Sequence, residues 1–236
     1  MNKLFAGVLA ALSVPMLSSP VVAANDPDSI GRTVKYLDYA AGKSVLMATA
    51  VASATPCDPN IYNCFILNET GTGTFDVPNL TSVEIGANSS RALICSSIQY
   101  NASYFFRNFA TDSTVRRSSM LVQPSVKIES AALTDLNLVN PLTGVPFNGA
   151  IVRPMSSFLD EANLAAGQIE QHAQNWSSDC TRGILSRAML MKEYGLSSTV
   201  AQRVMTRSIK ITVGVNIINS NMYRSNFNLA VRMYSD

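Results

Sequence analysis

The stretch IKITVGVNIINSNMYRSNFNLAVRM, residues 209–233, decides the fold class. Apolar and polar side chains alternate along both of its halves, which is the pattern of strands with one buried face. The polar tripeptide Asn219-Ser220-Asn221 separates the halves and is typical of a turn. We therefore expect a C-terminal β-hairpin. Its apolar faces consist of Ile209, Ile211, Val213, Val215 and Ile217 before the turn and Phe227, Leu229, Val231 and Met233 after it.

The N-terminal two-thirds of the chain carry the same kind of signal. Turn signals such as Asn140-Pro141-Leu142-Thr143-Gly144 separate short runs that are rich in β-branched and aromatic residues. These runs predict a β-rich region over residues 25–154, built as an antiparallel β-sandwich. The clearest of them are 72–77, 81–85, 92–98, 102–106 and 120–128.

Between residues 157 and 206 the apolar period changes to three and four, which predicts two or three helices. A second helix is expected over 181–194, ended by Gly195, and a short third one begins at Ser197 or Ser198 and reaches Met205. The fold class is therefore α+β and β-rich, and residues 155–236 are expected to pack with the β-rich region as one domain. The first helix is expected over 157–176, with an apolar face of Leu159, Ala162, Ala166, Ile169, Ala173 and Trp176.

Residues 1–24 have the layout of a secretory signal peptide. Lys3 precedes an apolar run that ends at Leu12, and Val21-Val22-Ala23-Ala24 offers small residues for cleavage. The run is shorter than the about 20 residues that a membrane-spanning helix needs. We therefore expect export to the periplasm, the cell surface or the medium, with no transmembrane segment after cleavage. Loss of Lys3 changes the formal net charge from +2 to +1.

An exported chain meets an oxidising compartment, so its four cysteines favour two disulfides. Cys57 and Cys64 flank a turn-rich loop and are expected to pair, which leaves Cys95 with Cys180. The other two connectivities stay open. Paired C-x-x-C motifs are missing and the chain has a single histidine, so a zinc site is not expected, nor is any other metal.

The low charge narrows the range of partners. Charged residues make up 14% of the chain, against about 25% in typical proteins, and the net charge is close to zero. Nucleic acid is therefore not an expected partner, because its phosphates require a clustered basic surface. Ala41-Gly42-Lys43-Ser44 matches the end of a phosphate-binding loop, but Leu37 stands where the first glycine should be. No cofactor is expected.

The inventory for catalysis is poor. His172 is the single histidine, so every histidine-based nucleophilic mechanism must use it, and we expect it partly exposed on the first helix. Carboxylate pairs need no histidine, and the candidates are Asp160 with Glu161 and Asp76 with Glu84. Adjacent acids on a helix diverge by about 100°. Asp76 and Glu84 serve only if the strands bring them together.

The densest aromatic run is that of Tyr100, Tyr104, Phe105, Phe106 and Phe109. Alternation places Tyr104 and Phe106 on one side of a strand, where they are either core residues or a platform for a sugar ring or a partner strand. On the second interpretation Tyr100, Tyr104 and Phe106 contact the ligand. The candidate basic residues nearby, for an anionic envelope polymer, are Arg107, Arg116 and Arg117.

Two hypotheses for function follow from these observations. The first is an exported bacterial envelope or surface protein with a non-catalytic binding or structural role, in adhesion, assembly or envelope-polymer binding. It rests on the signal peptide, the cysteines, the uncharged polar surface and the poor catalytic inventory. The alternative is a secreted carboxylate-dependent hydrolase that acts on a polysaccharide. The sequence leans against an enzyme, and a protein or an envelope polymer is the expected partner.

Overall fold

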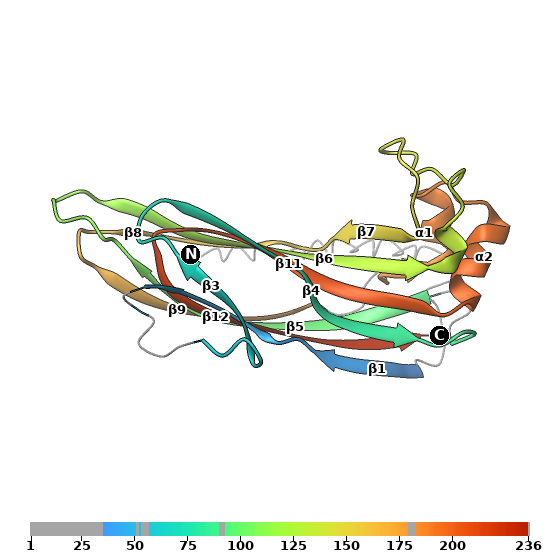
Figure 1. Cartoon of the computed structure of the whole chain (residues 1–236), viewed down its shortest axis with the longest axis horizontal. Coiled ribbons are helices and arrows are strands. Elements are labelled where there is room, and N and C mark those ends of the chain that lie inside the picture. The colour runs from blue at the N-terminus through green and yellow to red at the C-terminus, as the bar shows by residue number, and fades with distance from the viewer. Residues whose placement is uncertain (1–34, 51, 53–56, 90–92, 179–182, 236) are drawn as a thin grey trace, which may run out of the picture.

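The computed structural model describes residues 35–50, 52, 57–89, 93–178 and 183–235. The predicted signal peptide lies outside these residues. Figure 1 shows an elongated sandwich of two β-sheets with the helices gathered at one end. Within the described ranges, no helix is long and apolar enough to cross a membrane.

Sheet A has seven strands in the order β10-β5-β12-β2-β3, with β1 also paired to β12 and β9 also paired to β5. Its ladders are antiparallel except for the parallel pair β2 and β3. Its strands are β1 (Lys35–Ala41), β2 (Ser44–Thr49), β3 (Tyr62–Leu67), β5 (Leu93–Arg107), β9 (Ile169–Ser178), β10 (Leu185–Ser186) and β12 (Met222–Ser235).

Sheet B has five strands in the order β4-β11-β6-β7, with β8 also paired to β6. All of its described ladders are antiparallel. Its strands are β4 (Thr72–Ile85), β6 (Arg116–Ser130), β7 (Ala150–Pro154), β8 (Phe158–Leu164) and β11 (Ile209–Ser220). The helices are the 3-10 turn η1 (Ala131–Leu133), α1 (Arg187–Lys192) and α2 (Ser198–Thr206). The β-rich sandwich expected from the sequence is thus present.

The core lies between the sheets because the long strands bury every second residue. On β6 the even-numbered positions from Ser118 to Ser130 are buried, and on β5 those from Ile94 to Phe106 are buried. The rings of Tyr100 on β5 and Phe227 on β12 have their centroids 6.0 Å apart. Each large apolar side chain that is fully buried contributes about 1.5–3 kcal/mol to folding. Strict alternation over such long strands therefore stabilises the two-layer arrangement.

The prediction of a C-terminal hairpin is wrong, although both of its strands form. β11 pairs with β4 and β6 in sheet B, whereas β12 pairs with β5, β1 and β2 in sheet A. The turn crosses from one sheet to the other at Asn221, which has a positive φ of 49°. Its side chain donates to the carbonyl of Arg117 at 2.9 Å, and its carbonyl accepts from the Arg107 amide at 3.0 Å. The alternation of apolar and polar residues is the same whether two consecutive strands pair in one sheet or lie in two facing sheets. It therefore does not show that the strands form a hairpin.

The predicted helix over 157–176 is also wrong, because the segment forms β8 in sheet B and β9 in sheet A. Leu159 and Ile169, two members of the supposed apolar stripe, are 54% and 48% exposed. Some of the positions that point inward are polar, so the apolar residues of this segment do not recur at every second position as they do in a typical strand. These inward positions are Phe158, Asp160, Ala162 and Leu164 on β8 and Glu170, His172, Gln174 and Trp176 on β9.

The second predicted helix is present in part, and the third is present. Of the segment 181–194, residues 187–192 form α1, while 185–186 form β10 and residues 181–182 lie outside the described residues. The third predicted helix is α2, and the Ser197 hydroxyl caps it by accepting from the Val200 amide at 3.3 Å. Gly195 has a φ of 64°, as expected of a residue that ends a helix.

A bulge in sheet B depends on a glycine. Val213 and Val215 of β11 stand opposite Thr81 and Val77 of β4, so three residues of β4 face the single residue Gly214. A Cβ atom at Gly214 would lie 2.7 Å from the carbonyl oxygen of Pro78, a backbone atom. Pro78 has no amide hydrogen, which suits a bulge rather than a regular ladder position.

We expect Gly214→Ala to lower the free energy of unfolding by about 1–3 kcal/mol, because the backbone of Pro78 must move away from the new methyl group. Urea denaturation measures this change. Gly86→Ala is the matched control, since its Cβ would find its nearest neighbour, the Ser89 hydroxyl, at 3.6 Å. Equal midpoints for Gly214→Ala and Gly86→Ala would contradict the close approach of the two strands.

Candidate functional site

The aromatic residues proposed as a ligand platform lie inside the sandwich. Tyr100 is 2% exposed, and Tyr104 and Phe106 are 0% exposed, because all three occupy the inward positions of β5. Tyr100 stacks on Trp176 at 5.0 Å between centroids, and Tyr104 stacks on His172 at 5.6 Å. These rings belong to the core, and a surface platform made from them is not present in this structure.

The three candidate arginines do not gather into one free basic patch. The Arg107 guanidinium lies over the ring of Phe109 at 4.9 Å and over that of Tyr223 at 5.3 Å. Arg116 and Arg117 are on β6, in the other sheet, where Arg117 pairs with Glu161. An anionic polymer would therefore meet cations on two separate sheets, and one of them is already paired.

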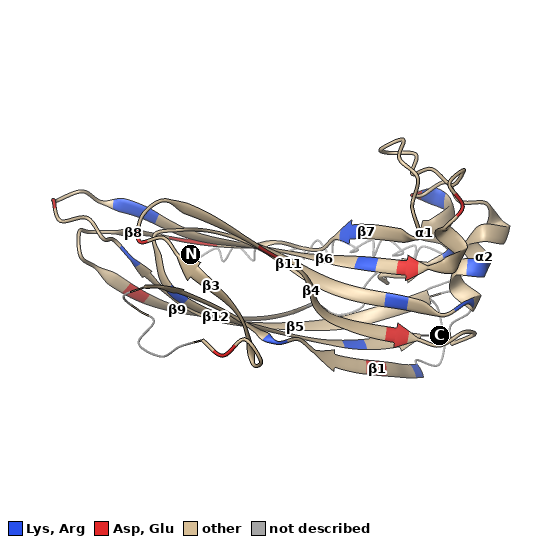
Figure 2. Ribbon diagram, viewed as in Figure 1, with Lys and Arg blue, Asp and Glu red and all other residues tan. Residues whose placement is uncertain are grey.

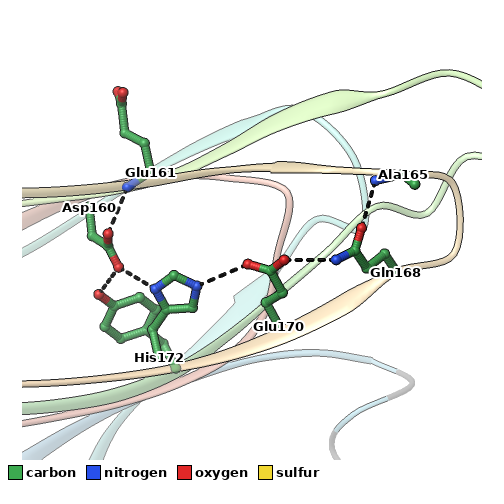
Figure 3. Close-up of polar contacts among 7 residues, drawn as sticks. Asp160, Glu161, Ala165, Gln168, Glu170 and His172 are labelled. Carbon is green, nitrogen blue, oxygen red and sulfur yellow. Dashed lines mark hydrogen bonds and ion pairs between the residues drawn. The ribbon is translucent and has the colours of Figure 1, made fainter.

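A polar cluster bridges the two sheets at the end of the sandwich away from the helices (Figure 3). Asp160 of β8 accepts a hydrogen bond from the Tyr104 hydroxyl of β5, and its Oδ2 lies 2.7 Å from Nδ1 of His172 on β9. The other ring nitrogen, Nε2, lies 3.4 Å from Oε2 of Glu170. His172 is thus a residue of a strand and of the sheet interface, so the prediction that it lies on a helix is wrong, whereas its side chain is partly exposed, at 22%, as predicted.

The cluster differs from a nucleophilic triad. Both nitrogens of the His172 ring lie beside carboxylates, whereas a triad places a hydroxyl or thiol nucleophile beside one of them. Glu161 points away from Asp160 in Figure 3, because neighbouring residues of a strand face opposite sides. Asp76 and Glu84 lie eight residues apart on the single strand β4, which separates them by roughly 26 Å. Neither carboxylate pair proposed from the sequence is therefore realised.

Among the residues that the structure describes, no group of three or more potential ligands gathers around a metal position. The predicted Cys57–Cys64 disulfide is present and closes the loop before β3, with 6.0 Å between the two Cα atoms. Cys180 lies outside the described residues, so its pairing with Cys95 stays a prediction.

The outward side of sheet A carries a three-by-three grid of uncharged residues, which we call the neutral face. Its central row is Asn175, Asn101 and Asn228, paired in register across β9, β5 and β12. The β5 and β9 members are exposed and those of β12 are half-buried. With a strand spacing of about 4.8 Å and a two-residue repeat of about 6.6 Å, the grid spans roughly 10 by 13 Å. The flanking rows are Ala173, Ser103 and Asn226 on one side and Ser177, Gln99 and Ala230 on the other.

Two exposed tyrosines of β1 and the half-buried Tyr234 of β12 lie beyond the neutral face, around Arg232. Tyr36 and Tyr39 of β1 are 57% and 48% exposed. The ring of Tyr36 meets that of Tyr234 edge-on at 6.1 Å, and the Arg232 guanidinium lies 6.0 Å from the Tyr39 ring centroid. We call Tyr36, Tyr39 and Tyr234 the tyrosine edge. Its rings offer apolar faces with polar tips beside a surface of amides and hydroxyls.

The outward side of sheet B carries charged residues of both signs on β4, β11 and β6 (Figure 2). Lys210 of β11 stands in register between Glu84 of β4 and Glu129 of β6, and Lys127 pairs with Glu129 at 2.7 Å. These four residues help to line a groove of about 590 Å³ in which the two signs are balanced. The absence of charge is therefore a property of the nine grid positions on sheet A, and not of both faces.

Alternation along β12 encodes one column of the neutral face. Once Phe227, Leu229 and Val231 are assigned inward, Asn226, Asn228 and Ala230 must point outward. Alternation does not encode the tyrosine edge, because a register shift between Tyr36 and Asp38 places Tyr36 and Tyr39 on one face despite their odd spacing.

Known proteins add little. No family model matches the chain, and no curated protein is similar to it. Among solved structures, the VP2 subviral particle of infectious bursal disease virus is similar at 9% identity, over 86% of this chain and 55% of that chain, with a TM-score of 0.19. The chain thus spans about half of that protein's length.

The cluster predicts that the free energy of unfolding falls at alkaline pH. Burial first, and then the hydrogen bond to Asp160 and its charge, raise the pKa of Tyr104 above its ordinary value of about 10. The neutral phenol thus stabilises the native state fully below about pH 10, and this stabilisation is lost as pH rises further. Burial also raises the pKa of Tyr100, which adds to the same loss.

We expect Tyr104→Phe to lower the free energy of unfolding by about 1–2 kcal/mol at neutral pH, through loss of the hydrogen bond, and to make the decline above pH 10 shallower. Urea denaturation at a series of pH values measures both effects. Between pH 7 and 9 the two proteins should show parallel curves, which serves as the internal control. An equally steep decline above pH 10 in the variant would contradict the assignment.

Proposed function

We propose that the protein is an exported bacterial envelope or surface protein with a non-catalytic role, and that it binds an uncharged, hydroxyl-rich envelope polymer through the neutral face. The observation that carries the proposal is the in-register grid of nine uncharged residues centred on Asn101. Export is supported by the signal-like N-terminus and by the Cys57–Cys64 disulfide, which suits an oxidising compartment.

The chemistry of the grid favours a polyol over other partners. An amide side chain both donates and accepts, and so does each hydroxyl of a sugar. An apolar partner would leave amides such as Asn101 and Asn175 buried without hydrogen bonds, at a cost of about 1–3 kcal/mol for each group. A polyanion would find no cation among the nine grid positions. The tyrosine edge adds rings against which the apolar faces of sugars can pack.

A secreted carboxylate-dependent hydrolase is the competing proposal. It needs two carboxylates that face each other across a substrate, about 5–10 Å apart. Asp160 and Glu170 do approach one place, but they approach the same imidazole ring, which fills the space between them. No carboxylate belongs to the neutral face. The geometry therefore favours binding without cleavage.

The proposal predicts that Asn101→Asp weakens polymer binding about tenfold, because the new carboxylate loses its water and no longer donates a hydrogen bond. Electrophoresis through gels that contain hydroxyethylcellulose, dextran or galactomannan measures the retardation of the protein by each neutral polymer. We expect at least one of them to retard the wild-type chain.

Gln123→Glu is the matched control, since it makes the same exchange of amide for carboxylate at an exposed position on sheet B. It should leave the retardation unchanged. Equal retardation of Asn101→Asp and wild type, or no retardation by any neutral polymer, would overturn the neutral face as the site. Release of shorter sugars from a polymer would overturn the non-catalytic role.

A further inference from the structure

An exposed apolar loop projects from the end of the sandwich that carries the helices (Figure 1). The loop connects η1 to β7 and covers residues 134–149. No charged residue stands between Asp135 and Arg153 in the sequence. Four large aliphatic side chains of the loop are exposed, namely Leu136 at 69%, Val139 at 42%, Leu142 at 82% and Val145 at 54%. Apolar side chains grouped in this way mark contact surfaces, whereas single ones are ordinary.

The loop is braced internally, so its apolar side chains are held outward instead of folding onto one another. The carbonyl of Asn140 accepts from the Gly144 amide at 2.8 Å, and its side-chain oxygen accepts from the Leu142 amide at 2.9 Å. The Asn140 amide donates to the Val145 carbonyl at 2.9 Å. Gly144 has a φ of 69°, a conformation that glycine adopts without strain. Leu142 is therefore presented at the tip by a fixed turn.

The loop also rests on the connection between α1 and α2 through specific contacts. The ring of Phe147, at its base, meets that of Tyr194 edge-on at 6.0 Å. A Cβ atom at Gly195, just after α1, would lie 3.5 Å from Pro141. The apolar tip and the two helices are thus one unit at this end of the molecule.

This unit is basic. Its acids are Asp135, which accepts from the Asn137 amide at 2.9 Å, and Glu193, which pairs with Arg153 at 3.5 Å. Four basic residues of the helices and of the position that follows α2 stand against these two acids and give +2, which equals the formal charge of the whole chain, so the rest of the chain sums to zero. The basic residues are Arg187, Lys192, Arg203 and Arg207.

We infer that this end of the molecule docks on a lipid bilayer that contains anionic lipids. Leu136, Leu142 and Val145 enter the boundary between headgroups and acyl chains, where the uncharged tip loses no ionic hydration. The basic residues of α1 and α2 attract the lipid phosphates electrostatically. Added salt screens this attraction and therefore weakens it. An apolar tip beside a local excess of positive charge suits this surface better than a second copy of the chain, which would bring the same charge to the contact.

Sedimentation of the protein with vesicles tests the inference. One set of vesicles is made of phosphatidylglycerol and phosphatidylcholine in equal amounts, and the other of phosphatidylcholine alone. We expect the protein to bind the first set, to bind the second set at least tenfold more weakly, and to leave the first set as salt is raised. Leu142→Asp should weaken binding to the first set at least tenfold, since it removes an aliphatic anchor and adds a repelled charge.

Ile66→Asp is the matched control, because Ile66 is 78% exposed but lies on β3, away from the loop. It should bind as wild type does, and both variants should keep the wild-type thermal unfolding midpoint. Equal binding to both kinds of vesicle, no binding to either, or equal loss in Ile66→Asp would overturn the inference. A wild-type dimer in sedimentation velocity that Leu142→Asp converts to a monomer would also overturn it, since the loop would then contact a second copy.

Discussion

The sandwich depends on the crossing of the chain from sheet B to sheet A at Asn221. β11 is flanked by β4 and β6, and β12 by β5 on one side and β1 and β2 on the other. Both strands therefore occupy the interior of a sheet and bury their odd-numbered apolar residues in one common core. Asn221 has a left-handed backbone conformation and is hydrogen-bonded to backbone atoms of Arg107 and Arg117. It therefore fixes the position at which the chain passes from sheet B to sheet A. All remaining strands pair outward from these two.

β8 and β9 repeat the crossing, but hold it with polar groups. Asp160 from one sheet meets Tyr104 and His172 from the other, and hydrogen bonds take the place of apolar packing across the interface. Such bonds are strong in a half-buried setting, and each partner that is lost leaves another unsatisfied. The cluster therefore ties β8 of sheet B to β5 and β9 of sheet A at this position.

The sequence predicted well what alternation can reveal. The strands around Phe227 and Ile211, the turn at Asn221, the helix capped at Ser197 and the Cys57–Cys64 disulfide all follow from local patterns. Which strands pair does not, since alternation is blind to the partner. The segment 157–176 was misassigned because inward polar residues such as Asp160 and His172 erased its period of two. The neutral face arises from register across three strands, which no single stretch encodes.

An uncharged contact surface has a kinetic consequence. Charged partners attract one another over about a Debye length and can raise association rates well above those of neutral pairs. The nine residues of the neutral face carry no charge, so a polymer that binds there as proposed would reach them by unassisted diffusion and would be held only after contact. Occupancy of this face would follow how much ligand lies nearby and how long each encounter lasts, and would be indifferent to the ionic strength of the surroundings.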